Sequence, residues 1–430
     1  MNTFLFWLKK LLPEWLLGIV RPTYHLMLSW IGAQLYRHPS CDITVIAVTG
    51  TKGKSTTVEL ITAILEAGGH KVASLSTIQF KIADDVRPNL YKMTTPGRFF
   101  VQHFLRQAVD AGCKYAVLEM TSEGAKQSRH RFIELDALVF TNLSPEHIES
   151  HGSFKLYKEA KLQIAKQLER SKKHPRYIVA NADDEHGKDF LAIKVEHKLP
   201  YSLSDLKLHT LHKDGVALIF KSEGEEITIR VSLVGLFNVY NSLAAITLTR
   251  TLGIGWKEIE RALSSLSKVS GRVEHFYSPT DSPKKVTAIV DYAHTPDSLE
   301  KLYQAFKDVR KVCVLGNTGG GRDRWKRPEM AGIAERYCDH IILTNEDPYD
   351  ENPRRIVEEM AKGIENKEKL EIIMDRTLAI RRALELSPDG GYVLVSGKGT
   401  DPYIMGANGT KQPWSDALVV TKELENLSRT

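Results

Sequence analysis

Residues 45–57 read Val-Ile-Ala-Val-Thr-Gly-Thr-Lys-Gly-Lys-Ser-Thr-Thr, an apolar run that ends in glycines, a lysine and a serine. Where a strand passes through such a turn into a helix, backbone N–H groups face an anion. Lys54 could then lie against the terminal phosphates of a nucleotide, and the Ser55 hydroxyl could bind Mg²⁺. The usual pattern has a glycine five residues before Gly53, where this chain has Val48, and glycine and threonine also suit an ordinary turn. The Gly-Lys-Ser-Thr run at the junction favours a phosphate-binding loop.

Two further polar residues follow apolar runs. Glu119 ends the run that begins at Tyr115, and His147 follows the run that ends at Phe140. Because the ends of parallel strands meet at one edge of a sheet, a carboxylate and an imidazole there could bind Mg²⁺ beside the phosphate loop. Each residue alone is weak support, since a single buried histidine is more often a hydrogen-bonded polar residue than a ligand. Lys161 falls on a predicted helix, where a charged residue usually faces solvent.

These residues need a sheet to position them. From residue 43 to about residue 270, apolar runs alternate with amphipathic stretches, which predicts an α/β fold with a mainly parallel sheet. Near residue 270 the pattern restarts and predicts a second, Rossmann-like domain. Residues 206–233 predict an antiparallel patch. Strands are expected at 43–48, 114–118, 136–140, 176–180, 286–290, 311–315, 340–344, 370–374 and 391–396, and helices at 55–67, 97–111, 154–170 and 238–252.

The composition is that of a globular protein with more than one domain. At 430 residues the chain is too long for a single core, and 42% hydrophobic with 26% charged residues is an ordinary balance. A net charge of +6 fits anionic small molecules and does not indicate nucleic acid. The four cysteines are far apart and form no CxxC pair, so neither a disulfide framework nor a zinc site is predicted, and a reducing cytoplasm is expected.

The first 36 residues are rich in leucine and aromatic residues. Charged residues and a proline interrupt them, so no uncharged run reaches the roughly 18 residues that a membrane span needs. No small-residue cleavage site follows. Two interpretations are open: a pair of helices packed on the protein, which is favoured, and a peripheral segment that rests on a membrane surface.

Together these motifs resemble the Mur ligase family. They follow the family order from about residue 43 to residue 416 and are jointly highly specific. Within the family they are most similar to the enzymes that add the third residue of the peptidoglycan stem peptide. The matching runs are Thr49-Gly-Thr-Lys-Gly-Lys-Ser-Thr56, Thr94-Thr-Pro96, Leu118-Glu-Met-Thr-Ser122, Phe140-Thr-Asn-Leu143, His151-Gly-Ser153, Ala160-Lys161, Asn181-Ala-Asp-Asp184, Gly235-Leu-Phe-Asn-Val-Tyr-Asn241, Gly271-Arg-Val-Glu274, Asp291-Tyr-Ala-His-Thr-Pro296, Gly319-Gly-Gly-Arg-Asp-Arg-Trp-Lys-Arg-Pro328 and Gly397-Lys-Gly399.

The resemblance implies an ATP-dependent ligase that joins a carboxylate to an amine through an acyl phosphate and releases ADP and phosphate. It implies that Ser55 and Glu119 hold one Mg²⁺, that His147 serves a second metal, and that CO₂ carbamylates Lys161 into an anion that helps hold that metal. Two cations would offset the repulsion between the attacking carboxylate and the γ-phosphate. The implied catalytic residues are Lys54, Glu119, His147 and Lys161, and the implied nucleotide contacts are Gly50, Thr51, Lys52, Gly53, Lys54, Ser55, Thr56, Asn238, Arg272 and Asp291.

The resemblance also implies a domain plan and a pair of substrates. Residues 1–42 form an apolar helical segment, 43–270 the central P-loop-type ATPase domain and 271–430 the C-terminal domain, and the family's uridine-binding N-terminal domain is expected to be absent. The substrates are a muropeptide-type acceptor, linked to a nucleotide or a lipid, and a free amino acid. The implied substrate contacts are Thr94, Thr95, Glu123, His294, Arg322, Tyr349 and Asp401.

Two positions depart from the family pattern. Glu123 stands where the family has a histidine. Tyr349 stands where members that use meso-diaminopimelate carry an arginine that holds the far carboxylate of that substrate. The nearby Glu351-Asn-Pro-Arg354 run does not occupy this position, although Arg354 or Arg322 could reach in from a neighbouring loop. We therefore expect that diaminopimelate is not held in the usual way and that lysine or another amino acid competes with it.

Two other functions fit part of the sequence. Folylpolyglutamate synthase, in the same superfamily, is disfavoured because it tends to carry glycine after the loop lysine, where this chain has Ser55, and by the run that begins at Asp291. A non-catalytic ATP-binding subunit of a membrane-bound cell-wall assembly is disfavoured because the four implied catalytic residues are present. A cytoplasmic monomer without a nucleic-acid partner is expected.

Overall fold

The structure, a computed structural model, describes residues 14–91, 93–146, 148–222, 224–321 and 324–427. Its contacts divide the chain into two compact units. The first holds the described residues up to Asp205 together with Tyr240–Ala262, and the second holds Leu206–Val239 with the described residues from Leu263 on. Two of the division points fall inside the helices α9 (Leu236–Thr251) and α10 (Trp256–Ser265), and none coincides with the predicted domain limit at residue 270, which stays a prediction.

Within the described residues, the first unit is built on an eight-stranded sheet in the order β4-β3-β2-β5-β1-β6-β7-β8. β1 lies between β5 and β6, and all three strands run parallel. β3 is antiparallel to β2, and the edge strand β4 is antiparallel to β3. The predicted mainly parallel sheet is therefore confirmed, although β2, β3, β4 and β8 were not predicted. The strands are β1 (Thr44–Thr49), β2 (Val72–Leu75), β3 (Gln79–Ile82), β4 (Asp85–Pro88), β5 (Tyr115–Glu119), β6 (Ala137–Phe140), β7 (Tyr177–Asn181) and β8 (His197–Tyr201).

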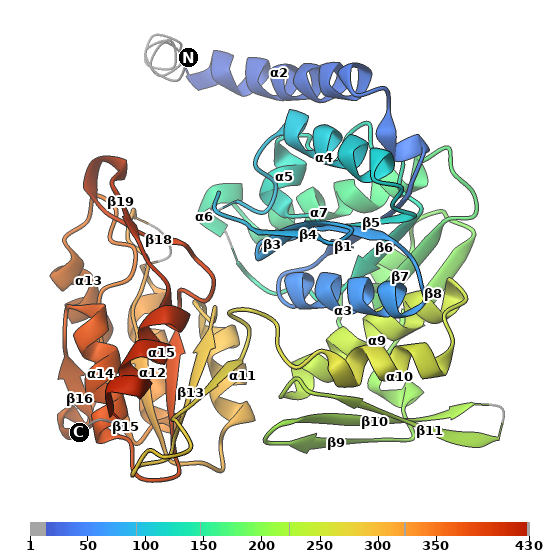
Figure 1. Ribbon diagram of the computed structural model, residues 1–430. Coiled ribbons are helices and arrows are strands. Elements are labelled where there is room, and N and C mark those ends of the chain that lie inside the picture. The colour runs from blue at the N-terminus through green and yellow to red at the C-terminus, as the bar shows by residue number, and fades with distance from the viewer. Residues whose placement is uncertain (1–13, 92, 147, 223, 322–323, 428–430) are drawn as a thin grey trace. The chain divides into compact units, whose positions relative to one another are not determined.

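Helices cover both faces of this sheet (Figure 1). Val45 and Ala47, at alternate positions of β1, pack with buried side chains of α4 and α7. On the other face α3 contacts β1, β2 and β5. The sheet is therefore buried between two helical layers, as its near-continuous apolar strands predict. The helices are α3 (Lys54–Ala67), α4 (Arg98–Asp110), α5 (Ser122–Lys126), α6 (Ile148–His151), α7 (Phe154–Glu169), α8 (Gly187–Leu191) and α10 (Trp256–Ser265).

The N-terminal helix α2 (Glu14–Leu35) packs on α4. This contact agrees with one half of the favoured interpretation, a packed pair of helices. The other half would fall among residues 1–13, which lie outside the described residues. In the part of the chain that the structure describes, no helix is long and apolar enough to cross a membrane.

The second unit is built on a sheet of six described strands in the order β12-β13-β17-β14-β15-β16. β12 is antiparallel to β13, and the other neighbours are parallel. One face packs on α11, α12 and α13, and the other packs on α14 and α15. This arrangement confirms the Rossmann-like fold predicted for the C-terminal part of the chain. The elements are β12 (Glu274–Tyr277), β13 (Val286–Asp291), α11 (Pro296–Ala305), β14 (Lys311–Leu315), α12 (Lys326–Tyr337), β15 (His340–Leu343), α13 (Pro353–Ala361), β16 (Leu370–Ile372), α14 (Arg376–Leu386), β17 (Gly391–Ser396) and α15 (Asp416–Leu427).

Two small antiparallel sheets complete the unit. The predicted antiparallel patch is confirmed as β9 (Leu208–His212), β10 (Gly215–Ser222) and β11 (Glu225–Val231). A hairpin of β18 (Tyr403–Met405) and β19 (Lys411–Pro413) follows β17.

The cysteine expectation is wrong at one place, because Cys313 and Cys338 form a disulfide. Cys313 lies in β14, and Cys338 lies just before β15. The parallel pairing of these two strands brings the residues together although 25 positions separate them in the sequence. Cys41 and Cys113 are free thiols.

Candidate active site

The glycine turn after β1 is fixed by the end of the neighbouring strand β6. Gly50 and Gly53 have φ angles of +151° and +81°, a region that favours glycine. The N–H of Thr51 donates to the Asn142 carbonyl at 2.8 Å, and the N–H of Lys52 donates to Asn142 Oδ1 at 2.9 Å. A Cβ on Gly50 would collide with the side chain of Thr141, so the turn cannot take a larger residue there. The result is a rigid loop at the N-terminal end of α3, as predicted.

The first turn of α3 brings three of the predicted residues together. Ser55 Oγ donates to Glu119 Oε2 at 2.8 Å, and Lys54 Nζ lies 4.0 Å from Glu119 Oε1. Lys54 Nζ also donates to the Thr51 carbonyl at 2.9 Å. Ser55 and Glu119 are buried. β1 and β5 are neighbouring parallel strands, so their carboxyl ends lie side by side. Lys54 and Ser55 follow β1, and Glu119 is the last residue of β5.

Lys161 is buried beneath the glycine turn. Its Nζ donates to the Gly50 carbonyl at 2.5 Å and lies 4.8 Å from the centre of the Tyr157 ring. Burial, and next the positive charge of Lys54, lower the pKa of Lys161 well below its ordinary value. The expectation from local sequence, a solvent-facing lysine, is therefore wrong. The Tyr157 hydroxyl lies 3.0 Å from Thr51 Oγ1, so α7 supports the turn with two side chains.

Lys52 forms an ion pair with Glu146, which directly precedes His147, the residue predicted to serve the second metal. Its Nζ lies 2.7 Å from Glu146 Oε1. The following residue, His147, lies outside the described residues, so its predicted role stays a prediction. Among the residues that the structure describes, no group of three or more histidine, cysteine, aspartate and glutamate side chains could hold a metal ion.

The predicted acceptor contacts Thr94 and Thr95 lie close to the same strand ends. Thr77 Oγ1 is 2.7 Å from Thr94 Oγ1 and donates to Glu119 Oε1 at 3.1 Å. Arg129 donates to the Thr95 carbonyl and, at 3.1 Å, to Thr95 Oγ1. Arg129 was missed because it has no motif of its own, and only the fold brings it to Thr95.

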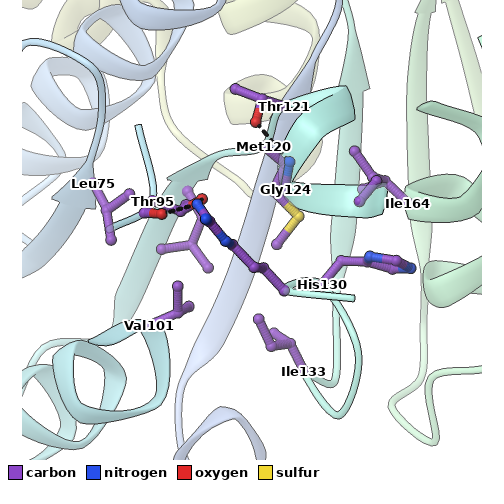
Figure 2. A pocket seen from close by; sticks show the side chains of 12 residues that line it. Leu75, Thr95, Val101, Met120, Thr121, Gly124, His130, Ile133 and Ile164 are labelled. Atoms are coloured by element: carbon purple, nitrogen blue, oxygen red, sulfur yellow. Dashed lines mark hydrogen bonds between the residues drawn. The ribbon is translucent and has the colours of Figure 1, made fainter. Parts of the chain in front are cut away.

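Thr95 and Arg129 line a small and mostly apolar pocket (Figure 2). Met120, Ile133 and Ile164 contribute to its walls. His130 also lines it, and burial lowers the pKa of His130 to about 4, so its imidazole is neutral near pH 7.

Glu123 lies on the short helix α5 in a polar cluster. Ser150 Oγ donates to Glu123 Oε1, and His151 Nε2 lies 3.2 Å both from that carboxylate oxygen and from Ser122 Oγ. Thr121 is the N-cap of this helix, and its hydroxyl accepts a hydrogen bond from the Gly124 N–H. A histidine side chain is therefore present beside Glu123, but it comes from α6.

The two asparagines of α9 have different surroundings. Asn241 lies against Gly53, where a Cβ would collide with its amide, and its Oδ1 is 3.4 Å from Thr57 Oγ1. Asn238, the predicted adenine contact, falls in the second unit, where its Nδ2 donates to the Val234 carbonyl at 2.9 Å. Asn241 is thus a helix residue that contacts the glycine turn; it ends a run that matches the family, but the sequence alone gave it no role.

The remaining predicted nucleotide residues lie at the end of β13. Asp291 is buried, and its carboxylate accepts hydrogen bonds from the N–H groups of Val273 at 2.8 Å and Ala293 at 2.7 Å. The guanidinium of Arg272 lies 4.5 Å from the centre of the Tyr292 ring. His294 packs on the same ring at 4.6 Å between centroids. Asp291 therefore fixes two backbone segments, the one next to Arg272 through Val273 and the one next to His294 through Ala293.

Asp401 faces a buried lysine in the loop after β17. Lys398 Nζ donates to Asp347 Oδ1 at 2.8 Å and to the Tyr403 carbonyl at 2.7 Å, and it lies 3.5 Å from Asp401 Oδ2. The negative charge of Asp401, and next burial, raise the pKa of Tyr292 well above its ordinary value. Asp401 is therefore close to the aromatic ring that Arg272 and His294 contact.

Tyr349 lies between Gly320 and the β18–β19 hairpin. Its φ angle is +51°, which is uncommon for a residue other than glycine. Its N–H donates to the Met405 carbonyl at 3.0 Å, and a Cβ on Gly320 would lie 3.5 Å from its ring. Arg354 is exposed, and Arg322 lies outside the described residues. In the described part of this loop, then, an aromatic ring stands at the position that the resemblance gives to an arginine.

Glu346, three residues earlier, was not predicted. It is buried, and burial raises the pKa of its carboxyl group. Thr318 Oγ1 donates to Oε1 at 2.8 Å, whereas Oε2 has no hydrogen-bond partner among the described residues. A buried carboxylate oxygen of this kind can accept a hydrogen bond from a ligand.

Most of the chain matches known proteins. Residues 48–249 match a family model described as the Mur ligase middle domain, and residues 271–399 match one described as the Mur ligase, glutamate ligase domain. Relatives from Syntrophomonas wolfei and Aquifex aeolicus, each a UDP-N-acetylmuramoyl-L-alanyl-D-glutamate–2,6-diaminopimelate ligase, are 34% and 36% identical to this chain. The alignments cover 90% and 91% of this chain and 79% of each relative.

Solved structures match it as well. One ligase of the same description has a TM-score of 0.60 at 28% identity, over 89% of this chain and 78% of that one. Folylpolyglutamate synthase from Mycobacterium tuberculosis has a TM-score of 0.69 at 16% identity, over 87% of this chain and 92% of that one, which shows a shared fold alone.

Proposed function

This chain belongs to the Mur ligase family, and we propose that it joins a free amino acid to the carboxylate of a UDP-muramoyl peptide. It is an ATP-dependent ligase of peptidoglycan precursor synthesis. The observation that carries the proposal is the meeting of Lys54, Ser55 and Glu119 at the glycine turn, with Lys161 buried beneath it. The likeness to folylpolyglutamate synthase is one of fold and does not establish function, whereas the two relatives at 34% and 36% identity are described as UDP-N-acetylmuramoyl-L-alanyl-D-glutamate–2,6-diaminopimelate ligases.

ATP fits the loop from Gly50 to Thr56. The backbone N–H groups of the turn and the N-terminal end of α3 favour phosphate oxygens. Lys54 would neutralise charge on the transferred phosphoryl group. We assign Asn238, Arg272 and Asp291 to nucleotide binding on the resemblance.

Mg²⁺ fits the oxygen donors of Ser55 and Glu119. A hydroxyl and a carboxylate 2.8 Å apart, both buried, are hard ligands of the kind that Mg²⁺ takes together with phosphate oxygens and water. When bound, the ion would supply positive charge that offsets the repulsion between the acceptor carboxylate and the γ-phosphate. His147 is assigned to a second ion on the resemblance.

We assign Lys161 as a carbamylated residue. Its lowered pKa favours the neutral amine, which is the form that attacks CO₂. In that step the nitrogen forms a bond to carbon, one C=O bond of CO₂ becomes C–O⁻, and the amine proton leaves to solvent. The positive charge of Lys54, which disfavours an ammonium here, would stabilise the carbamate anion.

The acceptor is assigned to Thr94, Thr95 and Glu123, together with Arg129. Arg129 lies against Thr95 and brings a guanidinium, which suits a carboxylate-bearing peptide. The acceptor carboxylate would attack the γ-phosphate to give an acyl phosphate, and the amino group of the second substrate would then displace phosphate to form the amide.

The amino acid is assigned to the second unit, with His294, Arg322, Tyr349 and Asp401 as contacts. Tyr349 cannot form the charged bidentate contact that an arginine makes with a carboxylate. Glu346 instead offers a buried carboxylate oxygen, Oε2, that has no hydrogen-bond partner among the described residues and suits a free amino group. We therefore propose that diaminopimelate is not held through its far carboxylate and that lysine competes with it.

The proposed location is the cytoplasm, where ATP is available, and the proposed state is a monomer. The peripheral membrane contact that the sequence leaves open would be made by the N-terminal helix.

One experiment tests the function. The chain is mixed with ATP, Mg²⁺, UDP-N-acetylmuramoyl-L-alanyl-D-glutamate and either diaminopimelate or lysine, and phosphate release is measured with the mass of the product. Equal amounts of phosphate and amide are expected only when all components are present. Lys54→Ala should be inactive, whereas Lys81→Ala, which removes an ion pair with Glu66 elsewhere in the same unit, should remain active. Phosphate release without amide would overturn the proposal, and product from a folate and glutamate would support the alternative ligase.

A further inference from the structure

The helix α2 has two different sides. The side that faces α4 carries small buried residues, Ser29, Gly32 and Ala33. A Cβ on Gly32 would lie 3.5 Å from the Phe99 ring, so glycine lets the two helices approach closely. Ser29 Oγ donates to the Ser128 carbonyl at 2.9 Å, which ties the helix to the loop after α5.

The opposite side of α2 is apolar and exposed. Six large apolar side chains on this helix are 36% to 63% exposed in the described residues. Their spacing of three, four and seven residues places them on a continuous outer face. We call this the outer face of α2; it comprises Tyr24, Leu26, Met27, Trp30, Ile31 and Leu35. Figure 1 shows α4 between α2 and the sheet, so α2 is the outermost layer on this side of its unit.

The charged residues that flank the apolar stretch of α2 in the sequence are mostly basic. No lysine, arginine, aspartate or glutamate occurs from Pro22 to Tyr36, and Arg21 and Arg37 border this stretch. In the first 38 residues the basic residues are Lys9, Lys10, Arg21 and Arg37, whereas the acidic residue is Glu14. An apolar face with tryptophan and tyrosine, in a segment whose neighbouring charged residues in the sequence are mostly basic, is the pattern of a helix that lies in the interface of an anionic membrane.

We propose that the outer face of α2 is a membrane-docking surface whose partner is a bilayer containing anionic lipids. The helix would lie parallel to the membrane, because no described helix is long and apolar enough to cross one. Its inner side would stay on α4, so the first unit would be held at the lipid surface. The proposal rests on α2 and not on the ligase activity.

A second copy of the chain is a weaker candidate for this face. A stable protein interface takes about 20–30 residues from each partner, whereas the outer face offers six side chains on a single helix. Residues 1–13 could also cover it, but they carry the same combination of apolar, aromatic and basic residues as α2. That combination suits a lipid surface better than a protein core, where lysine is rarely buried.

Vesicle flotation tests the proposal. The full chain is mixed with vesicles of phosphatidylcholine alone or with 30 mol% phosphatidylglycerol, in low salt and in 0.5 M NaCl. We expect flotation with the anionic vesicles, weakened at least fivefold by salt. Met27→Ser with Ile31→Ser should lower the bound fraction at least tenfold, and brominated lipids should quench wild-type fluorescence more than that of Trp30→Phe.

The matched control changes two exposed leucines elsewhere. Leu211 and Leu418 are exposed apolar residues of the second unit. Leu211→Ser with Leu418→Ser should float like the wild type, whereas an equal loss in both double variants would overturn the proposal. So would the absence of flotation at low salt. A dimer in light scattering that Met27→Ser with Ile31→Ser dissolves would assign the face to a second copy. A lowered melting temperature of that variant without flotation of the wild type would assign it to residues 1–13.

Discussion

Two buried lysines, one in each unit, are held in opposite ways. Lys161 donates to the Gly50 carbonyl, and no carboxylate lies within ion-pair distance of it in the part of the chain that the structure describes. Lys398 forms an ion pair with Asp347 and lies near Asp401. Burying a charge without an opposite partner costs several kcal/mol, whereas a hydrogen-bonded pair recovers much of that cost.

Lys398 is therefore a structural cation with carboxylate partners, whereas Lys161 is a buried amine that is hydrogen-bonded to a backbone carbonyl. Lys398 has its counter-charges in the folded chain, so it positions the loop after β17 as it stands. Burial and the positive charge of Lys54 lower the pKa of Lys161 and so favour its neutral amine, the form that our proposal requires for reaction with CO₂. Four experiments test the roles of the two lysines and of the loop near Lys398.

The largest effect is expected from Lys161→Ala. Activity should fall about a thousandfold, the range seen when an enzyme loses one electrostatic contact to its transition state. Acetate should restore part of the rate, because it can supply the carboxylate that the carbamate provides. The measurement is amide formation with and without acetate. Lys166→Ala, an exposed position of the same helix, serves as the control, and near-normal turnover of Lys161→Ala would end the carbamate assignment.

Lys398→Met should act on stability instead. It leaves Asp347 and Asp401 without their cation, and breaking a buried pair on one side typically costs about 3–5 kcal/mol of unfolding free energy. Chemical denaturation measures the loss, with exposed Lys422→Met as the matched control. A second change, Asp347→Asn, should recover part of the loss. If Lys398→Met and Lys422→Met unfold alike, Lys398 is not the structural cation.

Tyr349→Arg should change the choice of amino acid. A hydrogen bond to a charged group contributes about 1.5–3 kcal/mol, so kcat/KM for diaminopimelate relative to lysine should rise roughly 10- to 150-fold. The two substrates are compared in the wild type and the variant. A wild type that already prefers diaminopimelate a thousandfold, and keeps that preference in Arg354→Ala, would refute the interpretation of Tyr349.

The smallest effect is a pH dependence of stability. In CO₂-free buffer the folded chain releases the Lys161 proton at a lower pH than the unfolded chain, in which a lysine has a pKa of about 10.4. The unfolded state binds more protons, so stability rises with pH between the lowered pKa and about 10.4 and is lost as pH falls. The wild-type curve should be steeper than that of Lys161→Met by at most about 1.4 kcal/mol per pH unit. Parallel curves would show that Lys161 stays charged.

Much of the site at the glycine turn of the first unit could be predicted, because its residues lie either in one short run of sequence or at the ends of strands. The glycine turn, Lys54 and Ser55 follow from a run of a few residues at the strand-to-helix junction. Glu119 follows from the rule that neighbouring parallel strands end at one edge, and the structure brings it to Ser55. Arg129 and Asn241 could not be found this way, since they reach Thr95 and Gly53 from elements far away in the sequence.

Local sequence patterns located the strand-to-helix junction that carries Lys54 and Ser55, because glycine turns, apolar runs and strand ends are local properties. The register of the sheets and the packing of helices decided which residues from distant parts of the sequence meet. Those long-range contacts bury Lys161, join Cys313 to Cys338 and place Tyr349 beside Gly320. They also divide α2 into a buried side of small residues and an exposed apolar side. Periodicity marks apolar positions, but which of them face a neighbour depends on the surface that the folded chain presents.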